Sequence, residues 1–123
     1  MLTKPLAPAV TMRDLIKDSL RLNPTRIVIG EVRDGSALDM LRAWNTGHPG
    51  GVATLHANSA LDALYRLEDL IAEVSLHIPR RAIAAAIDVL VFVERTPEGR
   101  RVREIANVSG IHGEIYELAP ATA

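Results

Sequence analysis

The chain has 123 residues, of which 48% are hydrophobic and 24% are charged, and this length suits one compact domain. Its formal net charge of −1 does not predict nucleic acid or an anionic membrane as an obligatory partner. The absence of cysteine excludes disulfides and thiolate metal sites. No apolar run approaches the roughly 20 residues that span a bilayer, so we expect no transmembrane segment and a protein that stays where it is made.

The first part of the chain is predicted to be an arm followed by a helix. Residues 1–10 carry Pro5 and Pro8 without a periodic apolar pattern, which favours a flexible arm. A helix is predicted from Thr11, whose hydroxyl can cap the first turn, to Leu22.

A strand, a helix and a second strand are predicted next. Residues 26–30 are a short, β-branched apolar run, which suits a strand buried on both faces. The following helix ends at Gly47, and residues 52–56 form the second buried strand. Three residues can begin that helix: Asp34, Gly35 and Ser36.

Two further helices are predicted before the last strands. Asn58 or Ser59 caps the first of them, and Pro79 fits the first turn of a shorter helix that runs to Ile87. The longer helix carries an apolar stripe of Leu61, Leu64, Leu67, Ile71 and Val74.

The last third of the chain has the pattern of strands. Residues 88–94 predict a third strand, 96–99 a turn, and 101–108 and 111–118 two antiparallel strands, before a tail at 119–123. The sequence therefore predicts an α/β domain, with a short parallel sheet, flanking helices and an antiparallel extension at the carboxyl end.

Two titratable side chains stand at the ends of the two buried strands. Glu31 and His56 should converge, because groups at the carboxyl ends of neighbouring parallel strands share one crevice. Glu31 could orient or deprotonate a water at a phosphate and Mg²⁺ site, and His56 could donate a hydrogen bond to a terminal phosphate. Taken singly, each also has a structural explanation: Glu31 paired with Arg33 or capping the next helix, and His56 as an ordinary satisfied polar residue.

The sequence lacks other recognisable chemistry. It contains no glycine-rich phosphate loop that ends in Lys and Ser or Thr, no histidine pair with zinc-site spacing and no nucleophile elbow.

Three segments in order resemble the secretion-type traffic ATPases, hexameric P-loop enzymes of type II secretion, type IV secretion, conjugation and type IV pili. These segments are Arg-Ile-Val-Ile-Gly-Glu-Val-Arg-Asp at 26–34, Leu-Arg-Ala-Trp-Asn-Thr-Gly-His-Pro-Gly-Gly at 41–51, and Thr-Leu-His-Ala-Asn-Ser at 54–59. The resemblance covers residues 11–118 and implies the carboxyl-terminal part of a RecA-like ATPase domain. Asn-Thr-Gly-His-Pro-Gly and the lack of cysteine favour the conjugation and type IV secretion branch.

The resemblance implies a role for each matching residue. Residues 26–31 match the Walker B strand, in which Glu31 is the catalytic glutamate and contacts Mg²⁺ through water. His56 matches the histidine of the His box, which couples the γ-phosphate to conformational change. Gly30, Arg33 and Thr54 are implied contacts of the nucleotide.

The resemblance also implies ATP and Mg²⁺ as cofactors of the complete protein. Its partners would be copies of itself in a hexamer and an inner-membrane secretion or conjugation machinery, reached from the cytoplasmic face. No direct nucleic-acid binding is expected. The family's Walker A loop would precede Thr11 and is absent from this sequence, so we expect this chain alone neither to bind ATP tightly nor to hydrolyse it. The alternatives are a non-catalytic assembly or regulatory module derived from such an ATPase and, with less support, a RecA-like domain of a nucleic-acid motor.

Overall fold

The computed structural model describes residues 28–46 and 50–121. The predicted arm at 1–10, the predicted helix from Thr11 to Leu22 and the helix end at Gly47 lie outside the described residues.

Two short strands form a parallel pair. β1 (Val28–Ile29) pairs with β2 (Val52–Ala53), in the register Val28 with Val52 and Ile29 with Ala53. The prediction of a buried strand as far as His56 is wrong, because β2 ends at Ala53 and the Val52 side chain is 59% exposed. Burial on both faces requires elements packed above and below the strand, and the described residues leave Val52 largely uncovered.

Three helices follow the predicted pattern closely. α2 (Ala37–Asn45) begins after Ser36, α3 (Ala60–Ala72) begins after Ser59, and α4 (Arg80–Ala86) begins after Pro79. Ser59 Oγ accepts a hydrogen bond from the Asp62 amide at 3.0 Å, as predicted for a cap. Val74 is the exception on the predicted stripe, since α3 ends at Ala72 and leaves Val74 61% exposed in the following turn.

A separate antiparallel sheet closes the chain. β3 (Val89–Thr96), β4 (Gly99–His112) and β5 (Ile115–Pro120) pair in sequence order, and β5 continues two residues into the predicted tail. β3 pairs only with β4 among the described strands, so it does not extend the parallel pair. On one face of β3, Val89, Val91 and Val93 are each about half exposed.

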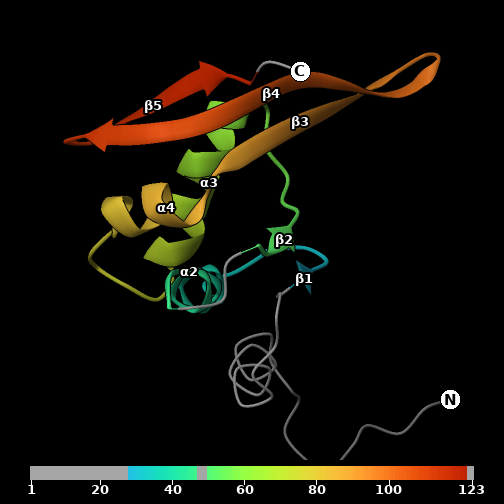
Figure 1. The fold of residues 1–123 in the computed structure, drawn as a ribbon. Helices are drawn as coiled ribbons and strands as arrows, with labels where there is room; N and C mark the ends of the chain where they lie inside the picture. Colours follow the sequence, from blue (N-terminus) through green and yellow to red (C-terminus); the bar gives the residue numbers. More distant parts are fainter. Residues whose placement is uncertain (1–27, 47–49, 122–123) are drawn as a thin grey trace, which may run out of the picture.

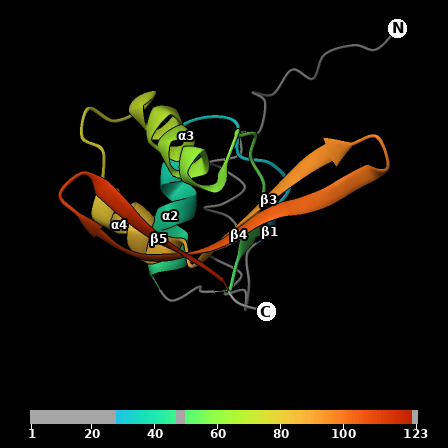
Figure 2. The same ribbon diagram turned by 90° about the horizontal axis from the view of Figure 1, so that it is seen from above.

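Figures 1 and 2 show the helices beside this sheet, and the core lies between the helices and its inner face. Tyr116 of β5 belongs to this core and is 6% exposed. A hydrogen bond from Asn45 Nδ2 to the Ala82 carbonyl, 3.0 Å long, connects α2 to α4. Burial of each large apolar side chain contributes about 1.5–3 kcal/mol. Six such side chains are less than 2% exposed: Met40, Leu41, Leu64, Leu67, Ile71 and Ile83.

Candidate functional site

The parallel pair brings Glu31 and His56 together. Hydrogen bonding between the two segments continues beyond the strands, because the Val32 amide donates to the Thr54 carbonyl at 2.8 Å and the Thr54 hydroxyl donates to the Gly30 carbonyl. Glu31 Oε2 consequently lies 3.6 Å from His56 Nε2. The convergence expected from the positions of the two residues in the sequence is therefore present in the structure.

Arg33 contacts the same carboxylate. Its Nε lies 3.2 Å from Glu31 Oε2, so the structural alternative of an ion pair between Glu31 and Arg33 is also present. The Glu31 side chain is 30% exposed, whereas the side chains of Arg33 and His56 are 76% and 90% exposed. Ion pairs this open to water contribute at most about 1 kcal/mol to stability, so they hold Glu31 only weakly.

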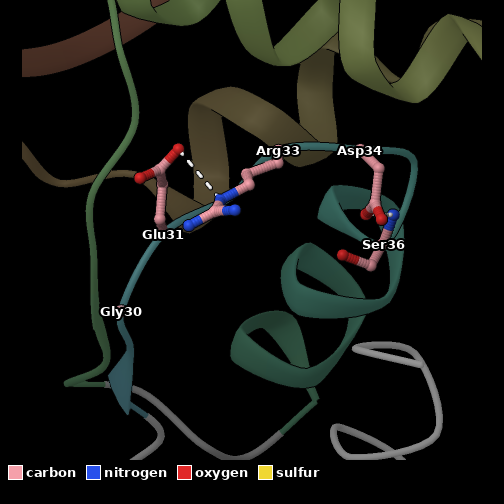
Figure 3. Close-up of a pocket in the computed structure, with 5 residues that line it drawn as sticks. All are labelled: Gly30, Glu31, Arg33, Asp34 and Ser36. Atoms are coloured by element: carbon pink, nitrogen blue, oxygen red, sulfur yellow. Dashed lines mark hydrogen bonds and ion pairs between the residues drawn. The ribbon is translucent and has the colours of Figure 1, made fainter. Parts of the chain in front are cut away.

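A hollow of about 420 Å³ adjoins Glu31. Figure 3 shows Glu31 on the loop after β1, with its carboxylate beside the Arg33 guanidinium, and Asp34 and Ser36 on the far side at the start of α2. Gly30 completes the lining. Of the residues predicted to contact nucleotide, Gly30 and Arg33 line this hollow, whereas Thr54 does not and instead fixes the Gly30 carbonyl.

Asp34 organises the far wall of the hollow. Its Oδ1 accepts a hydrogen bond from the Ser36 amide at 2.9 Å, and its carbonyl accepts from the Ala37 amide at 3.1 Å. Hydrogen bonds from the Ser36 side chain and backbone lower the pKa of Asp34, because they favour the charged carboxylate. The sequence placed Asp34 at the end of the 26–34 motif and identified both Asp34 and Ser36 as possible helix starts, but it did not predict their hydrogen bond, although an Asp two residues before a Ser at a helix start is a recognisable turn signal.

These residues can contact phosphate or Mg²⁺ but cannot form a metal site by themselves. Mg²⁺ keeps several waters and binds one or two carboxylates together with substrate phosphates. Glu31 offers one partly exposed carboxylate, and residues 28–46 and 50–121 contain no cluster of three His, Cys, Asp or Glu residues suited to a metal ion. The donor set therefore fits a Mg²⁺ that arrives with a nucleotide and does not fit an independent resident metal.

The fold and the contact between Glu31 and His56 agree with one protein family. Residues 7–107 match the family model described as "Type II/IV secretion system protein", and the chain belongs to this family. The predicted resemblance to the secretion-type ATPases, with its conjugal-transfer branch, is confirmed.

Individual relatives support the same conclusion. The chain is 52% identical over 108 residues to the conjugal transfer protein TrbB of Rhizobium radiobacter, covering 88% of this chain and 33% of that protein. It is 54% identical over 109 residues to the probable conjugal transfer protein TrbB of Sinorhizobium fredii, covering 89% and 34%. The chain thus spans about a third of the length of these relatives.

A solved structure matches the fold. The VirB11 ATPase from the Brucella suis type IV secretion system, crystallised with sulphate, superposes with a TM-score of 0.74 at 30% identity, over 80% of this chain and 32% of that one. The α/β class predicted from the sequence is confirmed. In the described part of this chain, no helix combines the length and the apolar character needed to cross a membrane.

Proposed function

We propose that this chain is the carboxyl-terminal part of a RecA-like ATPase domain whose complete protein powers conjugative transfer or type IV secretion. The observation that carries the proposal is the meeting of Glu31 and His56, 3.6 Å apart, just beyond the ends of β1 and β2. Glu31 lines the hollow, and His56 reaches it only through its contact with Glu31. The family membership of the chain and the names of its conjugal-transfer relatives support the same assignment.

Glu31 would position and deprotonate the attacking water. A general base must lie within hydrogen-bond reach of the proton that it removes, and a carboxylate on a loop fixed by two hydrogen bonds to the neighbouring segment is suited to that task. In the structure, Arg33 pairs with this carboxylate. Because the Arg33 side chain is 76% exposed, its guanidinium could turn toward a phosphate in the hollow. The guanidinium would then stabilise the negative charge of the phosphate and would no longer pair with the Glu31 carboxylate.

His56 would contact the terminal phosphate and couple it to Glu31. It is 90% exposed, so the imidazole can donate toward a ligand on one side while it faces the Glu31 carboxylate on the other. Mg²⁺, when it is bound with ATP, would neutralise charge on the phosphates, and Glu31 would contact it through water.

The proposal extends to the assembly. The complete protein would act as a hexamer at the cytoplasmic face of the inner membrane, together with the secretion machinery that its relatives' names imply. A non-catalytic assembly or regulatory module remains the second candidate function, since the Glu31–Arg33 ion pair would serve a purely structural role equally well.

The test is Glu31→Gln in the complete protein that contains this chain. We expect ATP affinity to change by less than about threefold and the rate of phosphate release to fall by about 10²-fold or more, because loss of a general base costs about 10²–10⁴-fold. Titration calorimetry with ATP and Mg²⁺ measures the affinity, and a phosphate-release assay measures the rate.

Glu117→Gln provides the matched control, since Glu117 lies exposed on β5 and does not line the hollow. We expect this variant to hydrolyse ATP at the normal rate. Turnover of Glu31→Gln above a tenth of the normal rate would sink the catalytic assignment. Normal turnover combined with lost transfer activity would favour the assembly module.

A further inference from the structure

The tip of the β3–β4 hairpin carries two arginines that repel each other. Arg95 and Arg100 are direct cross-strand partners, so their side chains emerge side by side on one face. Both are exposed, and neither makes an ion pair with the described part of the chain. Like charges that face each other across strands are destabilising, so this pair would be relieved by an anionic group from outside.

An exposed apolar ladder lies behind the arginine pair on the same face. Val93 pairs with Val102, and Val91 pairs with Ile105 beyond a register shift. These four side chains are 48%, 52%, 55% and 43% exposed, in that order. We call this face, from Val91 to the Arg95–Arg100 pair, the hairpin face. Its partner should combine carboxylates with an adjoining apolar surface.

The carboxyl end of α3 has that combination. Asp69 and Glu73 are exposed, one helical turn apart, and no basic residue stands in the last turn of α3. Negative charge at this end of a helix is unfavourable, because the helix dipole is itself negative there. Val74 and Leu76 follow, 61% and 107% exposed. We call these four residues the α3 end.

The two surfaces lie at opposite ends of the molecule. Both views place the hairpin tip far from the segment that connects α3 to α4 (Figures 1 and 2). The surfaces therefore cannot meet within one copy. Complementary patches on opposite ends of a chain join copies head to tail, and such contacts close into a ring when the rotation between copies allows it.

We propose that the hairpin face of one copy docks on the α3 end of a second copy of this chain. Arg95 and Arg100 would pair with Asp69 and Glu73, and the valine ladder would cover Val74 and Leu76. The pairing would relieve the repulsion between the two arginines of the hairpin. It would also neutralise the acids that lie unfavourably at the negative end of the α3 dipole.

The contact would also lie next to the candidate site. The Val74 side chain packs so closely on Gly35 that a Cβ there would come within 2.9 Å of Val74 Cγ2. Gly35 stands between Asp34 and Ser36, which line the hollow. A docked hairpin would thus border the hollow of its neighbour. The inference names the surfaces of the proposed ring and does not depend on ATP hydrolysis.

The test is charge reversal on each surface of the full 123-residue chain, with self-association measured by sedimentation velocity over a concentration series. We expect Arg95→Glu with Arg100→Glu to weaken association by at least about tenfold, and Asp69→Lys with Glu73→Lys to do the same. An equimolar mixture of the two variants should regain association, because reversed pairs alternate with original pairs around a head-to-tail chain. The protein with all four substitutions should also associate.

Arg101→Glu with Arg103→Glu is the control, since it makes the same change in net charge, and Arg101 pairs with Glu94 on the other face of the hairpin. This control should associate nearly as the original chain does. Circular dichroism verifies folding, and Arg95→Gln with Arg100→Gln replaces the hairpin variant if that variant unfolds. A monomeric original chain, or a mixture of folded variants that stays dissociated, would overturn the proposal. Binding of the monomer to phosphatidylglycerol vesicles would then identify a membrane as the occupant.

Discussion

At the scale of single residues, Glu68 is a largely buried carboxylate with two polar partners. Its Oε2 accepts a hydrogen bond from the Tyr116 hydroxyl at 2.5 Å and lies 3.2 Å from Arg80 Nε. Tyr116 is 6% exposed and the Glu68 side chain 14%. Glu68 on α3 thereby joins α4 and β5, and the shielding from water makes these contacts worth more than surface ion pairs.

Tyr116→Phe should lower the free energy of unfolding by about 1–2 kcal/mol at neutral pH, because a hydrogen bond to a charged group is lost while Arg80 still partners Glu68. Burial, followed by the hydrogen bond to Glu68, raises the pKa of Tyr116 above its usual value of 10.0. The folded phenol therefore keeps its proton when the unfolded phenol ionises. The difference in free energy of unfolding between the original chain and Tyr116→Phe should therefore be complete below about pH 10 and should shrink as the pH rises further. Urea denaturation at a series of pH values measures it.

Tyr65→Phe is the control for that variant. Tyr65 is 43% exposed, and its ring lies 6.2 Å from that of Tyr116 between centroids, a contact that phenylalanine keeps. We expect a change within about 0.5 kcal/mol. An equal loss in both variants would contradict the assigned role of the Tyr116 hydroxyl.

At the scale of secondary-structure elements, Gly35 allows the start of α2 to approach the end of α3. It is buried, and a Cβ built on it would lie 3.2 Å from Val74 Cβ, an atom that cannot move without its backbone. Glycine is therefore required here for space. The sequence offered Gly35 only as one of three possible helix starts, since a contact 39 residues away along the chain leaves no local pattern.

Gly35→Ala should destabilise the fold by about 1–3 kcal/mol, the usual cost of forcing a methyl group into a packed contact. The measurement is the denaturation midpoint and slope in urea. Gly30→Ala is the matched comparison, because a Cβ on Gly30 would meet nothing within 4 Å. Equal stability of the two variants would show that the α2–α3 contact is unimportant.

At the scale of the whole molecule, the described fold supplies one side of the proposed nucleotide site. Glu31 and His56 meet, but the described residues provide no phosphate-wrapping loop, and the sequence contains none. Electrostatic stabilisation by preorganised amides and a lysine is usually the main contribution to phosphate binding at such sites.

ATP titrated into the 123-residue chain with Mg²⁺ should therefore give no saturable heat up to about 1 mM, which corresponds to a binding free energy weaker than about −4.1 kcal/mol. Calorimetry measures this directly. The complete protein serves as the positive control, and a dissociation constant in the micromolar range for the chain alone would refute the expectation.

The sequence by itself predicted the helices of the described residues, a cap at Asn58 or Ser59, the antiparallel hairpins and the convergence of Glu31 with His56. Helix periodicity, capping and turn residues are local, and an ordered set of motifs identifies a family before any contact is known. The tertiary structure alone decided three other features. These are the separation of β3 from the parallel pair, the exposure of Val52 and Val74, and the lining of one side of the hollow by Asp34 and Ser36. An apolar run does not specify which of its faces will find a neighbour, because burial depends on elements distant in sequence.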